Sequence, residues 1–226
     1  MSKIATSHEG RLPLSRILWW ALLVGAVAVL LLLASRSAGA ADEVSPAAHA
    51  LAHRLAVGTC GTCHGPHGDA GFPKFPRLAG QNANYLAAQL KAFRGQTRGD
   101  SDAIGYMWGM AAQLDDATIA ALADFYAHQP AAAPLRAATA DVSRGREIYE
   151  HGVESEGVPA CMACHGPDGH GMADFPRLAG QHAQYVLKQL GSFQSNMRDV
   201  AVMHGVAQNL REPELEAIAA YLETLP

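Results

Sequence analysis

The pattern Cys-x-x-Cys-His occurs twice in this 226-residue chain, first from Cys60 to His64 and again from Cys161 to His165. Together the two copies use all four cysteines of the chain. The pattern is the attachment signature of c-type haem. The cysteine sulfurs form thioethers with the haem vinyl groups, and the adjacent histidine becomes the proximal ligand of the iron. We therefore expect two covalently attached haem c groups, each containing iron.

Other chemistry uses cysteine pairs with the same spacing. A single pair could form a redox disulfide or half of a zinc site, and two pairs could together build a four-cysteine zinc site. Neither alternative explains why a histidine directly follows each pair. Neither explains why long, matching sequences follow both pairs. The haem interpretation accounts for both features.

The two halves of the chain repeat each other, which is the mark of duplicated units. The stretch FPRLAGQ occurs at residues 75–81 and again at residues 175–181. Further on, GYMWGMAAQL in the first half aligns with AVMHGVAQNL in the second half. Each attachment motif therefore begins an equivalent stretch of chain.

The repeat suggests where the domains lie. Residues 130–140 begin with small residues bracketed by prolines, which favours a short, semi-extended linker. We expect one domain over residues 45–129 and a second over residues 141–226. Residues 1–40 form a separate N-terminal segment.

Hydrophobic spacing predicts helices in both domains and no strands. Apolar and aromatic side chains recur at helical intervals over residues 82–94 and 182–193. The last helix of the first domain should begin near Asp115, a good N-cap residue, and its counterpart has Pro213 at an early helical position. The fold class is therefore all-α. Small domains have thin cores, so we expect a buried haem to supply much of each one.

The repeat also selects a second axial ligand for each iron. Met107 lies seven residues before Leu114, and Met203 lies seven residues before Leu210. No other methionine occupies the same place in both copies. A thioether sulfur is a soft, neutral ligand, and histidine–methionine ligation raises the reduction potential. With both faces occupied, an iron exchanges electrons but does not easily bind oxygen or peroxide.

The FPRLAGQ stretch offers further partners for each haem. A ligating histidine usually donates its other N–H group to a carbonyl or carboxylate, and Pro76 and Pro176 could expose such carbonyls. Four side chains could bond haem propionates, namely Arg77, Gln81, Arg177 and Gln181. For the arginines, ordinary surface charge is the alternative.

The N-terminal segment predicts how the chain meets a membrane. Residues 17–34 carry no charge, and three basic residues precede them. Basic residues before an apolar run keep that end in the cytoplasm, so the rest should lie in the periplasm. We expect a retained transmembrane helix in the bacterial inner membrane; the alternative is a soluble periplasmic protein after cleavage near Ala40.

Charge limits the kinds of partner. The chain carries a net charge of −4, of which residues 1–40 contribute +3, so the remainder carries −7. This acidic part argues against binding nucleic acid. It favours a protein partner with a basic docking face.

The motif order resembles the class I cytochrome c domain, and two such domains in tandem resemble the dihaem cytochrome c4 family. The resemblance extends from about Leu51 to the C-terminus. It implies two cytochrome c domains packed face to face, with haem propionates near the interface. The haem ligands that it implies are Cys60, Cys63, His64 and Met107, followed by Cys161, Cys164, His165 and Met203.

The resemblance also implies a function, namely electron transport in a respiratory chain without catalysis. Electrons would pass from a quinol-oxidising cytochrome complex to a haem-copper terminal oxidase, with no small-molecule substrate. The main alternative is an electron-transfer subunit of a periplasmic dehydrogenase complex. A third possibility, a dihaem peroxidase, needs an open sixth position on the iron, and the paired methionines argue against it.

Overall fold

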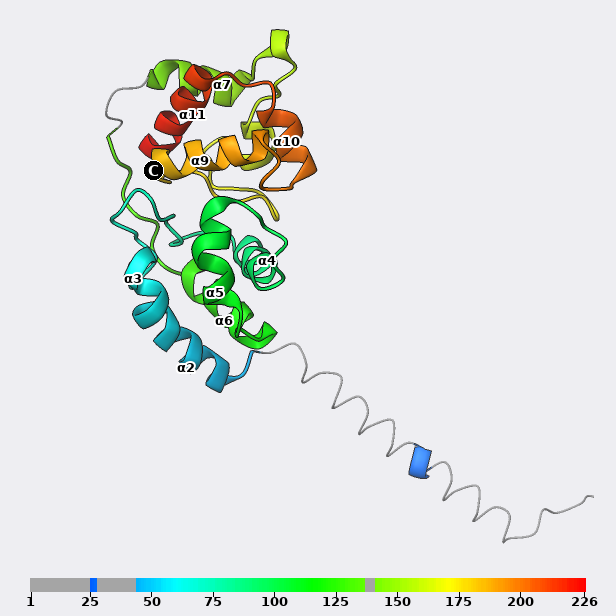
Figure 1. Cartoon of the computed structure of the whole chain (residues 1–226). Coiled ribbons are helices and arrows are strands. Elements are labelled where there is room, and N and C mark those ends of the chain that lie inside the picture. Colours follow the sequence, from blue (N-terminus) through cyan, green and yellow to red (C-terminus); the bar gives the residue numbers. More distant parts are fainter. Residues whose placement is uncertain (1–24, 28–43, 137–140) are drawn as a thin grey trace, which may run out of the picture. The chain divides into compact units, whose positions relative to one another are not determined.

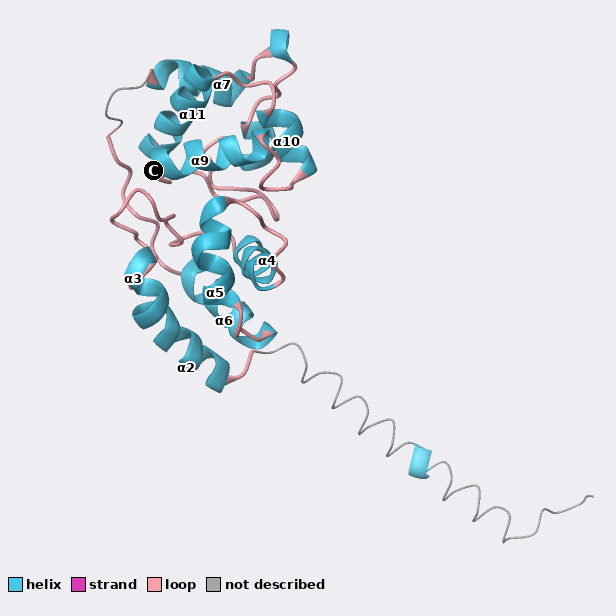
Figure 2. Ribbon diagram, viewed as in Figure 1, coloured by secondary structure: helices cyan, strands magenta, loops and turns pink. Residues whose placement is uncertain are grey.

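The computed structural model describes residues 25–27, 44–136 and 141–226. Residues 44–226 belong to one compact unit, in which every regular element of the described ranges is a helix (Figures 1 and 2). The expected all-α fold is confirmed. The expected membrane helix lies outside the described residues, apart from residues 25–27, and no helix within the described ranges is long and apolar enough to cross a bilayer.

We call residues 44–129 the first repeat and residues 141–226 the second repeat. The helices of the first repeat are α2 (Pro46–Leu55), η1 (Ala56–Cys60), α3 (Gly61–His64), α4 (Ala83–Arg94), η2 (Ala103–Met107), α5 (Trp108–Ala111) and α6 (Asp116–Ala127). Those of the second repeat are α7 (Val142–His151), η3 (Glu154–Glu156), α8 (Met162–His165), α9 (Ala183–Gln194), α10 (Ala201–Ala207) and α11 (Glu212–Thr224).

The helix starts follow from capping chemistry. Asn82 accepts a hydrogen bond from the backbone N–H of Tyr85 at 3.1 Å and so caps α4. Asp115 caps α6 as predicted, with its carboxylate 2.7 Å from the backbone nitrogen of Thr118. At α11 the carboxylate of Glu214 instead accepts from the backbone N–H of the N-cap residue at 3.0 Å.

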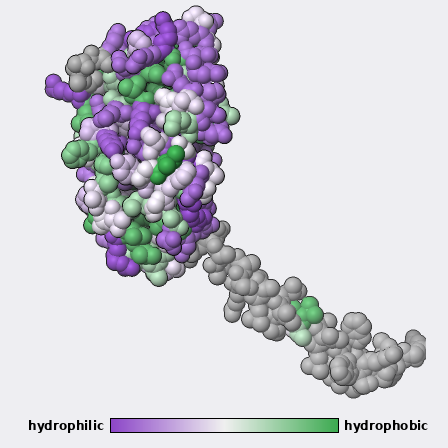
Figure 3. Space-filling view, viewed as in Figure 1, coloured by the Kyte–Doolittle hydropathy of each residue, from purple (hydrophilic) through white to green (hydrophobic). Residues whose placement is uncertain are grey.

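Each repeat packs its last helix against two others. In the first repeat α6 lies against α2 and α4, and in the second α11 lies against α7 and α9 (Figure 1). Helices α7 and α11 approach closely because Gly145 has no side chain. A Cβ atom at Gly145 would lie 2.0 Å from the carbonyl oxygen of Ala217. The surface in Figure 3 is largely polar, with the apolar residues in small, separate patches.

The repeats are joined by two matching pairs of hydrogen bonds. The Gln81 side chain accepts from the backbone N–H of Arg177 at 2.7 Å and donates to its carbonyl at 2.8 Å. Gln181 does the same with Arg77, at 2.9 Å for both bonds. Both glutamines are buried. The same seven-residue stretch in each repeat therefore binds its own copy in the other.

Candidate haem sites

The first candidate site is centred on His64 at the end of α3, whose imidazole is only 7% exposed. Its Nδ1 lies 2.9 Å from the carbonyl oxygen of Pro76. A carbonyl can only accept, so Nδ1 donates its proton and Nε2 keeps a free lone pair. Burial lowers the pKa of His64, partly offset by the hydrogen bond to Pro76, which favours the neutral imidazole that a metal ligand must be.

The second candidate site reproduces this geometry around His165 at the end of α8. Its Nδ1 lies 3.0 Å from the carbonyl oxygen of Pro176, its side chain is 7% exposed, and burial lowers its pKa. Phe175 meets the imidazole edge-on with ring centroids 6.0 Å apart, as Phe75 meets His64 at 6.2 Å. The two proline carbonyls expected from the sequence are therefore in the positions that orient both histidines.

The cysteines beside these histidines are unpaired thiols. Cys60, Cys63, Cys161 and Cys164 are all free and half-buried. Burial raises the pKa of Cys60 and raises that of Cys161 to about 11. A redox dithiol instead needs a lowered thiol pKa. In the part of the chain that the structure describes, no three cysteine, histidine or acidic side chains gather as metal ligands, so the two pairs do not form one zinc site.

The two methionines chosen by the repeat are half-buried, as is Met162 beside the second attachment motif. Met107 packs against a small core containing Phe93, and Met203 packs against the main core of the second repeat. By contrast, Met110 and Met197 are 57% and 48% exposed. A half-buried thioether beside an apolar core suits a haem ligand, although methionines also fill gaps in cores.

The arginines and glutamines of the FPRLAGQ stretch contact the interface between the repeats. The guanidinium of Arg77 donates to the carbonyl of Gly180 in the other repeat at 2.6 Å, whereas that of Arg177 donates to the carbonyl of Pro226 in its own repeat at 2.7 Å. Arg77 therefore joins Gln81 and Gln181 in holding the repeats together. Their expected bonds to haem propionates remain a prediction; Arg77 still has a buried Nε without a partner.

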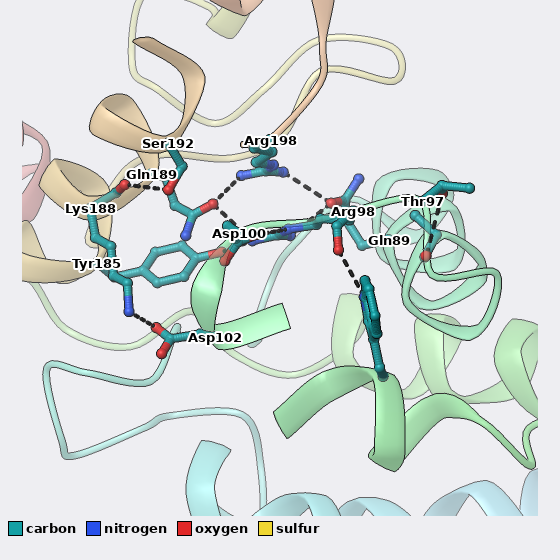
Figure 4. Close-up of polar contacts among 12 residues, drawn as sticks. Gln89, Thr97, Arg98, Asp100, Asp102, Tyr185, Lys188, Gln189, Ser192 and Arg198 are labelled. Carbon is teal, nitrogen blue, oxygen red and sulfur yellow. Dashed lines mark hydrogen bonds and ion pairs between the residues drawn. The ribbon is translucent and has the colours of Figure 1, made fainter. Parts of the chain in front are cut away.

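The sequence reasoning missed a second polar cluster at this interface. Figure 4 shows its centre, where side chains of the two repeats meet. We call it the arginine network, and its members are Tyr85, Gln89, Arg98, Asp100, Tyr185, Gln189 and Arg198. Six of the seven recur one hundred positions apart, so comparison of the two copies could have revealed it.

Comparison with known proteins decides what these sites hold. The family model described as "Cytochrome c" matches residues 50–129 and 142–226. The chain belongs to the cytochrome c family. Cytochrome c-552 of Acidithiobacillus ferridurans is 42% identical over 150 residues, which cover 66% of this chain and 65% of that protein. The thiosulfate dehydrogenase electron acceptor of Thiomonas intermedia is 35% identical over 159 residues, covering 66% and 70%.

A solved structure shows which group within the cytochrome c family this chain belongs to. The cytochrome c4 of Acidithiobacillus ferrooxidans superposes with a TM-score of 0.71 at 42% identity, covering 74% of this chain and 98% of that one. This cytochrome is therefore a member of the dihaem cytochrome c4 family. It carries two covalently attached haem c groups, one for each Cys-x-x-Cys-His motif, and it is a non-catalytic electron-transfer protein. The neutral, oriented imidazoles and free thiols fit these groups.

Proposed function

We propose that this cytochrome carries electrons between redox proteins on the periplasmic side of a bacterial inner membrane. One observation supports the proposal. In each repeat a proline carbonyl orients the motif histidine, and a half-buried methionine lies at the equivalent position of the chain. When bound, each haem iron gains and loses one electron. Closed coordination on both faces favours electron exchange over chemistry on a bound substrate.

The protein residues have distinct roles in this proposal. The cysteine pairs, Cys60 with Cys63 and Cys161 with Cys164, hold the haems covalently. His64 and His165 would bind the iron, and the carbonyls of Pro76 and Pro176 would fix the ring orientation and raise the basicity of the ligand. Met107 and Met203 would complete the coordination of the iron and exclude small molecules.

The ligand assignment can be tested with Met203→Ala, using Met197→Ala as the matched control because Met197 is 48% exposed. The first variant should lower the potential of the second haem and allow carbon monoxide to bind to its reduced form. The control should do neither. If both potentials are unchanged in Met203→Ala, Met203 is not the ligand. Rapid carbon monoxide binding by the unaltered protein would contradict closed sites.

We further propose that the cytochrome accepts electrons from a quinol-oxidising cytochrome complex and passes them to a haem-copper terminal oxidase. The second repeat exposes Glu147, Glu154, Glu212 and Glu216. This acidic surface supports docking to basic partner faces, which steer encounter more than they add affinity. Raising the ionic strength should therefore slow electron transfer to such a partner.

A second candidate is electron acceptor for a periplasmic dehydrogenase. It is favoured by the similarity to the Thiomonas intermedia protein, whose name states that role. Purification from native membranes in mild detergent separates the two candidates. A co-purifying dehydrogenase subunit supports the second, and a co-purifying oxidase supports the first.

For the chain organisation we propose domains at residues 45–129 and 141–226, joined by the linker 130–140. The residues matched by the family model support these limits.

We propose that residues 1–40 direct export and either remain as an anchor or are cleaved near Ala40. N-terminal sequencing of the purified protein distinguishes these outcomes, since a first residue of Ala41 means cleavage.

A further inference from the structure

In both repeats, the residue directly after the proposed methionine ligand bonds a backbone carbonyl. In the first repeat the indole Nε1 of Trp108 donates to the carbonyl oxygen of Arg98 at 2.8 Å. In the second, the imidazole Nδ1 of His204 lies 2.7 Å from the carbonyl oxygen of Phe193. A carbonyl can only accept, so Nδ1 of His204 carries the proton and donates the hydrogen bond. Two different side chains therefore make the same kind of bond at equivalent positions.

The helical turn that bears each methionine is weakly held on its outer side. Met107 lies between Gly105 and Gly109, where η2 ends and α5 begins. Met203 lies in α10, two positions before Gly205. Glycine weakens a helix because it loses the most backbone freedom on folding. Within the described ranges, no atom outside their own helical turns lies within 4 Å of the place that a Cβ atom would take at these glycines. Such turns open easily unless another contact holds them.

The two carbonyls belong to residues that the fold holds in place. The guanidinium of Arg98 donates to Asp100 at 2.6 Å and to Gln89 and Gln189 at 2.8 Å each (Figure 4). Phe193 lies near the end of the long helix α9, and its side chain is only 7% exposed. The donor side chains are therefore bonded to fixed points of each repeat.

The donors also lie close to the methionines in the packing. Trp108 and Met107 pack against the same small core, which includes Phe93. His204 is half-buried beside Met203 in the chain. A side chain that is bonded to a fixed carbonyl restrains the backbone of its own turn, and with it the neighbouring residue. Groups that do not touch a metal commonly orient the ligands that do.

We propose that Trp108 and His204 are positioning residues that hold the sulfurs of Met107 and Met203 at the iron. The inference rests on the proposed methionine ligands and adds the residues that decide how firmly each methionine stays bound. Without the N–H donor, the turn moves more freely and the sulfur leaves the iron more often. A small molecule can bind the iron only while the sulfur is away, so the two donors also keep the sites closed.

The rate at which carbon monoxide binds to the reduced, haem-loaded protein measures this release. Trp108→Phe keeps an aromatic ring in the core and removes the N–H group. It should speed binding at the first haem about fivefold, the factor that corresponds to one hydrogen bond, and leave the second haem unchanged. The methionine methyl signal that disappears from the NMR spectrum identifies the haem that has reacted. The charge-transfer band of the oxidised iron–methionine bond should weaken in parallel.

Tyr106→Phe is the matched control for the first repeat. Tyr106 directly precedes Met107, and its hydroxyl accepts from Lys74 at 2.9 Å on the surface. The substitution therefore also removes one side-chain hydrogen bond next to the methionine, but not one that joins the turn to a fixed carbonyl. Its carbon monoxide rate should stay within about twofold of the rate of the unaltered protein.

Two variants of His204 separate hydrogen bonding from packing in the second repeat. His204→Leu removes the donor and should speed binding at the second haem about fivefold. His204→Asn places a side-chain N–H group near the position of the imidazole Nδ1, so it should restore the original rate. Equal rates in the two variants would assign the effect to packing of the imidazole and overturn the proposal.

Folded Trp108→Phe and His204→Leu proteins with unchanged rates and an unchanged band would also overturn the proposal. That result would leave Met107 and Met203 as ligands, because the unaltered protein would still show the band. An unaltered protein without the band would contradict the ligands themselves and this proposal with them. If Trp108→Phe fails to fold, the His204 variants decide the question, since each repeat has its own donor.

Discussion

The hydrogen bonds between Gln81 and Arg177 predict a measurable loss of stability when the side chain is removed. Gln81→Ala deletes two bonds across the interface, at 2.7 and 2.8 Å, and one local bond to the backbone N–H of Asn82 at 2.9 Å. At about 1 kcal/mol per bond, the two interface bonds contribute roughly 2 kcal/mol. If the freed backbone groups of Arg177 stay shielded from water, the loss rises to about 4 kcal/mol.

The assay is guanidinium unfolding of the haem-loaded protein, followed by circular dichroism. Gln181→Ala should cost nearly as much as Gln81→Ala, because its bonds to Arg77 are equivalent. Gln129→Ala is the control, since that side chain only bonds the carbonyl of Phe125 within its own repeat at 2.9 Å. Its cost should stay below about 0.5 kcal/mol.

The double variant tests whether the interface opens as one unit. If the loss of either glutamine already separates the repeats, the second substitution has no further effect on the interface. The double variant then loses less stability than the sum of the losses in the two single variants. Unfolding should then occur in two steps, one for each repeat. The reasoning is refuted if Gln81→Ala is as stable as the Gln129→Ala control.

Two further predictions concern α7 and α11. Arg211 lowers the pKa of Glu214 to about 2 from a usual value of 4.5, so the carboxylate stabilises the fold above about pH 4.5, and this contribution is lost as the pH falls towards 2. Acid unfolding should therefore be shallower in Glu214→Gln, and identical acid titration curves would contradict this pairing. Gly145→Ala should destabilise the protein by about 2–4 kcal/mol in thermal unfolding, because its Cβ would meet the Ala217 carbonyl at 2.0 Å. Gly191→Ala is the helical control, open to solvent, and should be neutral or stabilising by up to about 1 kcal/mol; equal effects of the two substitutions would show that close packing is not responsible.

The local features of the fold could be predicted from the sequence because they depend on residues that are neighbours in the chain. The predicted helix over residues 82–94 is observed as Ala83–Arg94, with Asn82 as its cap. Asp115 caps the next long helix as expected. The proline carbonyls beside the histidines could be predicted because a ligating imidazole usually donates its other N–H group to a carbonyl or carboxylate.

Contacts between the repeats could not be predicted from the sequence in the same way. A glutamine side chain can bond a propionate or a backbone equally well, and only the folded chain shows that Gln81 reaches Arg177. Asp100 gave no signal in the sequence either, since its importance depends on its contact with Arg98 in the folded chain.

The matching glutamine bonds have a consequence for how the halves stay together. Each FPRLAGQ stretch binds its own copy, which is the self-complementary arrangement found in two-fold symmetric dimers. Two separate chains joined in this way would dissociate on dilution. Here the partners share one chain, so their effective concentration is set by the length of the connection and not by the amount of protein. The paired electron sites therefore persist at any cellular abundance, even where a comparable dimer would fall apart.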